Sequence, residues 1–254
     1  MIGLIGFGRF GKLAATHLSR AFKIYVYDPE DKAEAIEQAG AEAADFETTC
    51  HQKIVLLCMP ISAMENTLGK IAPLINPRAL VVDVCSVKVL PVNWMWEKMP
   101  ETVSLLATHP MFGPDSAGKS LKGRKIVLCP ERISAQRLNR ARSFLESMGL
   151  VVIESTPENH DRQIAVSLAL THFIGRSLSS FGADDLLMDT EGYRRLLHIL
   201  EVVENDTQQL FEDMHRFNPF AADTRLKFVE AMLEIEKGLE SKKTINRKPV
   251  RSCI

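Results

Sequence analysis

Short apolar runs alternate with amphipathic segments over the first 155 residues of the chain. The amphipathic segments predict helices over residues 9–20, 31–39 and 62–71. The apolar runs predict strands over residues 2–5, 23–27, 54–59, 80–84, 104–108 and 125–129. Continuous apolar strands separated by helices are typical of a parallel sheet covered on both faces. We therefore predict an α/β fold whose N-terminal part is a doubly wound parallel sheet.

The pattern changes after residue 132. A helix over residues 134–148 and a last strand over residues 151–154 are predicted, and from residue 156 to 240 only helical periodicity remains. The helices expected there span residues 161–181, 192–218 and 221–239. We therefore predict a sheet domain over residues 1–155, an all-helical domain over residues 156–240 and a basic, polar, disordered tail over residues 241–254.

Composition narrows the function classes. The formal net charge of -1 gives no reason to expect nucleic acid or an anionic membrane surface as a partner. No apolar run approaches the roughly 20 residues of a membrane span, so we expect no membrane segment. The first strand begins at residue 1 or 2, so we expect no leader and a cytoplasmic protein, or else a matured or trimmed chain. The five cysteines lack metal-ligand spacing, and their odd number argues against a closed disulfide framework.

Three glycines follow the first predicted strand at the start of the first helix. Gly6, Gly8 and Gly11 form G-x-G-x-x-G, which permits a tight turn, close approach to a pyrophosphate and close packing of helix on strand. This arrangement predicts a Rossmann dinucleotide site. The residues expected to line it are Gly6, Phe7, Gly8, Arg9, Phe10, Gly11, Asp28, Met59 and Pro60.

Asp28 ends the second strand, seventeen positions after Gly11, where an acid reads the ribose hydroxyls. A carboxylate there accepts from a 2′-hydroxyl and repels a 2′-phosphate, and no arginine follows at once. The sequence therefore favours NAD over NADP.

Two polar segments follow neighbouring predicted strands. Ser86 comes after the fourth strand and His109 after the fifth, and ligands of doubly wound folds bind at the carboxyl ends of strands. An imidazole there can take a hydroxyl proton near neutral pH, and a serine can orient the same oxygen. Serine also favours helix N-caps, which is the alternative role of Ser86.

At these residues the chain resembles the prephenate/arogenate dehydrogenase family, particularly its plant-like arogenate branch. The motifs that carry the resemblance are DVCSVK at 83–88, THPMFGP at 108–114, ENHD at 158–161, LTHFIGR at 170–176, GY at 192–193 and FNP at 217–219. They occur in both halves of the chain.

The resemblance implies NAD-dependent oxidative decarboxylation of prephenate, arogenate or both. It implies that His109 deprotonates the ring hydroxyl as hydride leaves for the nicotinamide, and that Ser86 bonds to that hydroxyl. It also implies that His172 lines the substrate pocket and that a homodimer forms through the helices. His172 has the alternative of a core histidine, and His160 is expected to cap or pack.

One feature of many relatives is missing: a W-R-D segment whose arginine binds a substrate carboxylate. The matching stretch, residues 205–211, has no arginine. Because buried carboxylates need a cation, the candidates are Lys88, Arg176, Arg194 and Arg195, of which Arg194 and Arg195 are preferred. Asp161 is a candidate partner for the ammonium group of arogenate, or a first-turn residue on the helix dipole.

Two other function classes stay open at this level. A β-hydroxyacid dehydrogenase or imine reductase would share the glycine loop, but would be expected to carry a catalytic lysine or a tyrosine or aspartate where this chain has Thr171-His172. A non-catalytic NAD-binding regulatory protein would not need Ser86, His109 and His172 together.

Overall fold

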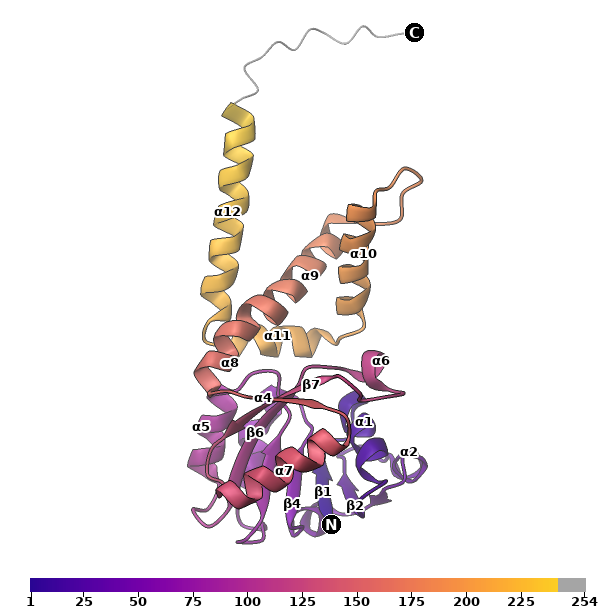
Figure 1. Cartoon of the computed structure of the whole chain (residues 1–254), viewed down its shortest axis with the longest axis vertical. Helices are drawn as coiled ribbons and strands as arrows, with labels where there is room; N and C mark the ends of the chain where they lie inside the picture. Colours follow the sequence, from indigo (N-terminus) through magenta and orange to yellow (C-terminus); the bar gives the residue numbers. More distant parts are fainter. Residues whose placement is uncertain (242–254) are drawn as a thin grey trace, which may run out of the picture.

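The computed structural model describes residues 1–241, so the predicted tail lies outside the described residues except for Ser241. The N-terminal part of the chain is a sheet flanked by helices. The later helices extend from the edge of the sheet at which the parallel strands end (Figure 1).

Eight strands form one sheet in the order β3-β2-β1-β4-β5-β6-β7-β8. Their bounds are β1 Ile2–Ile5, β2 Ile24–Tyr27, β3 Glu42–Ala43, β4 Ile54–Leu57, β5 Leu80–Asp83, β6 Ser104–Pro110, β7 Lys125–Pro130 and β8 Val151–Glu154. Every pairing is parallel except β6 with β7, which is antiparallel. The predicted parallel sheet is therefore confirmed for most strands and wrong at this pair, because an apolar run gives no strand direction.

The helices of the sheet layer are α1 Arg9–Leu18, α2 Ala33–Gln38, α3 Phe46–Cys50, α4 Ile61–Ile71, α5 Val89–Lys98, α6 Pro114–Ala117 and α7 Ala135–Ser147. The hydrophobic pattern did not predict β3, α3, α5 or α6. The elements β3, α3 and α6 are too short to show a clear hydrophobic period. The start of α3 is instead marked by a polar cap, since the Asp45 side chain accepts from the Thr48 amide at 2.6 Å.

After β8 the described chain is helical. The elements are α8 Pro157–Ile164, a π-helical segment η1 Ala165–Leu170, α9 Thr171–Phe181, α10 Glu191–Glu204, α11 Gln208–Arg216 and α12 Ala221–Ser241. The single helix predicted over residues 192–218 is wrong. The Thr207 side chain accepts from the Leu210 amide and caps α11, and a cap residue has non-helical backbone, so the helix is interrupted there.

The segments α8, η1 and α9 form one continuous helix, Pro157–Phe181. By length and composition it could cross a membrane, so the expectation that no segment approaches that length does not hold. The same helix carries the buried polar residues His160, Asp161 and His172, and it packs on α10 and α12. Its π-helical turn lies between the first two of these residues and His172, and such turns are frequent at functional sites.

Candidate active site

The glycine loop has the shape that a dinucleotide needs. Gly6 has φ +98, and a Cβ there would lie 2.5 Å from the Cys58 oxygen. A Cβ on Gly11 would lie 2.1 Å from the Gly6 oxygen, so helix and loop pack too closely for a side chain. A Cβ on Gly8 would meet nothing within 4 Å. The backbone is therefore open where a pyrophosphate would approach the start of α1.

Asp28 lies beside this loop at the end of β2. Its Oδ2 atom accepts from the Phe7 amide at 2.6 Å, and its Oδ1 atom from the Glu30 amide at 3.0 Å and Lys32 Nζ at 3.0 Å. Burial acts to raise the pKa of the Asp28 carboxyl, but these donors outweigh burial and the net pKa is lowered. Asp28 is therefore a carboxylate at neutral pH, as reading of a ribose requires.

The other residues expected to line the cofactor site do not all face the glycine loop. Phe7 is buried. Pro60 is the exposed N-cap of α4, and Met59 before it lies in the short connection from β4 to α4. Phe10 points into an apolar groove, where its ring centroid lies 6.3 Å from that of Phe112. Arg9 extends away from the loop to Asp115 and Asn205.

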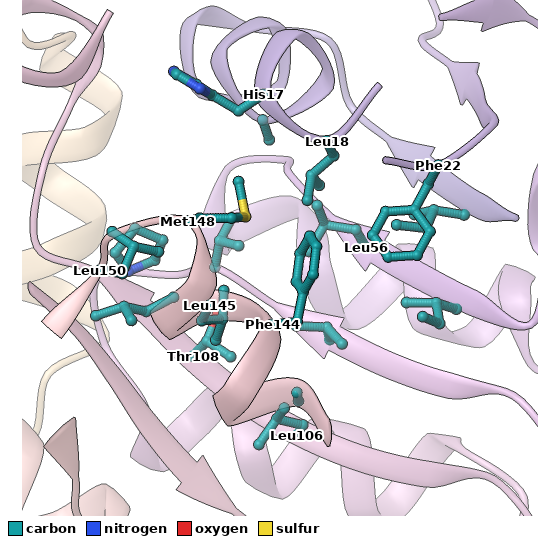
Figure 2. Close-up of a pocket in the computed structure, with 18 of the residues that line it drawn as sticks. His17, Leu18, Phe22, Leu56, Leu106, Thr108, Phe144, Leu145, Met148 and Leu150 are labelled. Carbon is teal, nitrogen blue, oxygen red and sulfur yellow. The ribbon is translucent and has the colours of Figure 1, made fainter. Parts of the chain in front are cut away.

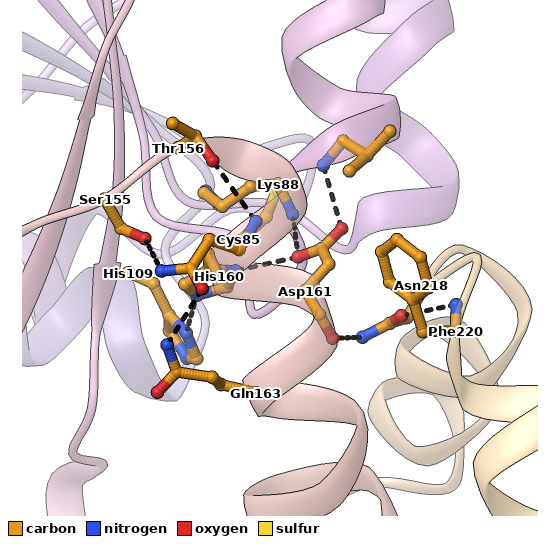
Figure 3. A network of polar contacts seen from close by, with 12 residues as sticks. Cys85, Lys88, His109, Ser155, Thr156, His160, Asp161, Gln163, Asn218 and Phe220 are labelled. Atoms are coloured by element: carbon orange, nitrogen blue, oxygen red, sulfur yellow. Dashed lines mark hydrogen bonds and ion pairs between the residues drawn. The ribbon is translucent and has the colours of Figure 1, made fainter.

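His109 lies at the start of a hydrogen-bonded chain (Figure 3). Its Nδ1 atom is 2.8 Å from Nε2 of His160, and Nδ1 of His160 is 2.7 Å from Oδ1 of Asp161. All three side chains are buried. His160, expected only to cap or pack, is thus a direct partner of the candidate base. This contact could not be predicted from sequence spacing, because 51 positions separate the two histidines.

Asp161 also joins the two halves of the molecule. Its Oδ1 atom accepts from the Lys88 amide at 2.7 Å and its Oδ2 atom from the Val89 amide at 2.9 Å, both at the start of α5. Its backbone oxygen accepts from Asn218 Nδ2 at 2.9 Å. With both carboxylate oxygens engaged and no exposed surface, Asp161 is a partner of His160 and α5, and cannot reach a substrate ammonium group.

Lys88 is likewise engaged. Its side chain is fully buried, and its Nζ atom pairs with Asp83 and donates to the Thr108 oxygen at 2.6 Å. A buried ammonium needs such partners. The Lys88 side chain therefore links Asp83 of β5 to Thr108 of β6, and its charge is not free to bind a substrate carboxylate.

Several buried polar atoms have no hydrogen-bond partner among residues 1–241. They are Ser86 Oγ, Arg142 Nε, His172 Nδ1, Arg176 Nε and His215 Nε2. Buried polar atoms are normally paired, so those of Ser86, His172 and Arg176 are candidates to bind a polar ligand. Ser86 does not cap α5, whose N-cap is Lys88. Ser86 comes shortly after the end of β5, and His109 lies near the end of β6. The two strands are parallel neighbours in the sheet.

His172 lies where the helical half meets the nucleotide loop. Its Nε2 atom is 3.6 Å from Oδ2 of Asp206, and Oδ1 of Asp206 is 3.8 Å from Nη1 of Arg9. Arg176, one turn after His172, donates to the Asp206 oxygen at 2.8 Å. Asp206 lies in residues 205–211, the stretch that matches the W-R-D segment of many relatives but has no arginine. The arginines near Asp206 are instead Arg176 of α9 and Arg9, the first residue of α1.

Burial favours the neutral form of His109 and of His172. Burial, assisted by His160 and Lys88, lowers the pKa of His109 well below its ordinary value. Burial also lowers the pKa of His172, with Arg176 acting in the same direction and Asp206 against it. A neutral His109 can accept a proton at physiological pH.

The preferred carboxylate partners from the sequence lie elsewhere. Arg194 and Arg195 are in the first turn of α10, with side chains 65% and 78% exposed, and pair with Asp189 and Glu191. α10 begins at its end away from the sheet (Figure 1). The described chain therefore does not bring them to His109, and Arg176 is the better-placed candidate.

A half-open groove of about 500 Å³ lies between α1, α7 and the sheet (Figure 2). Its lining is almost wholly apolar and includes Phe22, Phe144 and Met148. Thr108 and Pro110 line it, whereas His109, between them on β6, contacts His160. Alternate residues of a strand point to opposite faces, so this groove lies on the other face from the imidazole and is separate from the candidate active site.

The chain is similar to proteins of one group. A family model described as "Prephenate dehydrogenase, nucleotide-binding domain" matches residues 14–154, and one described as "TYRAAT1-like, C-terminal domain" matches residues 177–249. Arogenate dehydrogenase 2, chloroplastic, from Arabidopsis thaliana is 32% identical over 248 residues, covering 94% of this chain and 69% of that protein.

Solved structures agree with this result. The Synechocystis arogenate dehydrogenase matches with a TM-score of 0.69 and 25% identity, over 96% of this chain and 93% of that one. Prephenate dehydrogenase from A. aeolicus, in complex with hydroxyphenyl propionate and NAD+, matches with a TM-score of 0.76 and 22% identity, over 94% and 90%. The second likeness supports the fold.

Proposed function

Since the chain belongs to the prephenate/arogenate dehydrogenase family, we propose that it uses NAD to oxidise and decarboxylate a cyclohexadienyl acid, prephenate or arogenate. The observation that carries this proposal is His109, a buried imidazole of lowered pKa at the end of β6. The glycine loop and the Asp28 carboxylate are at the same edge of the sheet.

Bound NAD supplies the hydride acceptor. His109 takes the proton of the ring hydroxyl as hydride leaves the carbon that bears this hydroxyl. The bond from the ring to its carboxylate then breaks, carbon dioxide leaves, and the bonding electrons complete the aromatic ring. The ring oxygen, now a phenolate, takes the proton back from His109. Substrate and NAD+ thus give the aromatic product, carbon dioxide and NADH, without net proton release.

Three further residues have roles in this proposal. The Ser86 hydroxyl, buried and without a partner among residues 1–241, bonds to the reacting ring oxygen. Arg176 and His172 bind a substrate carboxylate, since each has a buried nitrogen without a partner in that part of the chain. A cation there offsets the cost of burying the carboxylate.

The direct test is to supply prephenate and arogenate separately, each with NAD and with NADP, and to measure NADH or NADPH and carbon dioxide together. We expect equal amounts of carbon dioxide and reduced nucleotide from at least one substrate. Reduced nucleotide from a β-hydroxy acid, or no turnover with nucleotide still bound, would favour the β-hydroxyacid dehydrogenase or regulatory alternative.

We also propose that the protein is a homodimer joined through its helical half. In α12, the side chains of Leu226, Met232, Leu233, Ile235 and Leu239 are each more than half exposed. This helix projects away from the sheet (Figure 1). A stripe of that kind is stabilised by a second copy of the same surface. Light scattering should give the dimer mass, and Leu233→Glu should shift it to monomer. A monomer at every concentration would contradict the proposal.

A further inference from the structure

We infer that His160 and Asp161 are positioning residues that fix the tautomer of His109, leaving its Nε2 atom as the proton acceptor. The hydrogen-bonded chain of these three side chains is drawn in Figure 3. This inference rests on the proposed role of His109 as the base.

The direction of the chain is set at Asp161. Its carboxylate accepts from the backbone amides of Lys88 and Val89, and an amide nitrogen donates and cannot accept. An ionised carboxylate is acceptor-only, so the 2.7 Å contact with His160 is a bond that His160 donates from Nδ1. Because these amides belong to the N-cap and the first residue of α5, the helix dipole also favours the negative charge at this place.

The remaining protons follow from the chemistry of neutral imidazole. A neutral ring has one N–H, so when His160 donates from Nδ1 its Nε2 atom can only accept. The 2.8 Å contact is then a bond from Nδ1–H of His109 to Nε2 of His160. His109 has no second ring proton, so its Nε2 atom carries the lone pair that a substrate hydroxyl requires.

The surrounding charges are consistent with this assignment. The ionisable groups packed around His109 are His160 and Asp161 from α8, and Lys88 and Asp83 from the end of β5. The Lys88 ammonium is held by Asp83 and the Thr108 oxygen, so it donates to neither histidine. Within residues 1–241, His160 is the group that holds the proton on Nδ1 of His109. In the Nε2–H form of His109, Nε2 has no free lone pair and cannot take the substrate proton.

Nitrogen-15 NMR of the histidine rings tests the inference on the free protein at pH 8, where an ordinary histidine is neutral. We expect the Nδ1–H tautomer for His109 in the wild type. His160→Leu removes the acceptor and should give a mixture of tautomers. His160→Gln can place its amide oxygen where Nε2 was, and should restore the Nδ1–H form. Exposed His198→Leu is the matched control and should change neither signal nor rate.

Kinetics give the second readout. We expect His160→Leu to lower kcat roughly 10- to 1000-fold, the range of a misdirected general base, with the KM and the Kd of NAD within about twofold. His160→Gln should recover most of the loss. The Nε2–H form of His109 in the wild type would overturn the inference even if His160→Leu failed to fold. Equal kcat in a folded His160→Leu would also overturn it. Failure of the wild type to turn over either substrate would contradict the proposed function and leave the NMR result to decide the tautomer.

Discussion

The Nη1 atom of Arg9 donates to the backbone oxygen of Asn205 at 2.5 Å, although 196 positions separate the two residues. Nη2 of Arg9 also holds both oxygens of Asp115, at 2.6 and 2.7 Å. Arg9 is the first residue of α1, directly after Gly8 of the glycine loop, and Asn205 precedes Asp206, the neighbour of His172. One side chain thus connects the expected nucleotide site to the helical half.

Removing this connection should affect substrate binding more than stability. We predict that Arg9→Ala raises the KM for the substrate several-fold, because Asp206 and His172 lose a neighbour that fixes their position. Stability should fall by less than about 1 kcal/mol, since exposed ion pairs contribute little. Lys12→Ala, on the exposed face of the same helix, is the control in steady-state kinetics and urea unfolding. Equal KM values for Arg9→Ala and wild type would contradict the connection.

Asp28 should determine the choice of cofactor. The hydrogen bonds that lower its pKa keep it charged at neutral pH, and a negative charge repels a 2′-phosphate. We predict that Asp28→Asn lowers the ratio of kcat/KM for NAD to that for NADP at least roughly tenfold, about 1.4 kcal/mol. The exposed Asp31→Asn should leave the ratio unchanged. The same ratio in both variants would show that another group selects the cofactor.

Close packing of α9 on α10 depends on Gly175. A Cβ there would lie 2.4 Å from Cγ2 of Val203, which is fully buried and stiff. We predict that Gly175→Ala destabilises the protein by about 1–3 kcal/mol, although alanine is the better helix former. In α4, Gly69→Ala has open space and should stabilise by up to about 1 kcal/mol. Denaturant unfolding compares the two, and Val203→Ala should rescue Gly175→Ala.

Buried neutral histidines should make the protein sensitive to mild acid. Burial lowers the pKa of His109, His172 and His215, the last to about 4. Below about pH 6.5 the unfolded chain therefore binds protons that the folded chain excludes. Stability is full above that pH and falls as pH decreases toward 4, by at most about 1.4 kcal/mol per pH unit for each histidine.

Urea unfolding at pH 7.5 and 5.0 measures this loss. His215→Asn keeps an acceptor for Arg225, whose Nη1 atom lies 2.6 Å from His215 Nδ1, but it cannot titrate. That variant should lose less stability between the two pH values than the wild type. An equal loss would show that His215 does not contribute.

Local pattern was enough to predict the sheet and the glycine loop. All strands except β3 are apolar runs, and Gly6, Gly8 and Gly11 stand between a strand and a helix, so period and position suffice for these features. The same reasoning placed Ser86 and His109 after neighbouring strands. The antiparallel direction of β7 was not predictable, because alternation and apolarity are the same in either direction.

The sequence did not predict which charged side chains pair with one another. Lys88 and Arg194 are both cations near a motif, yet Lys88 is buried on Asp83 and Arg194 is exposed on Asp189. Their partners follow from which elements pack together. His160 was missed for the same reason, since its contact with His109 forms only when α8 docks on the start of α5.

The central claim is that His109 is the base, and kcat of His109→Asn tests it most directly. We predict a roughly 10²- to 10⁴-fold fall in kcat with the Kd of NAD within about twofold, because the imidazole acts on the substrate and not on the nucleotide. A folded His109→Asn protein whose kcat stayed within threefold of the wild type would contradict the account.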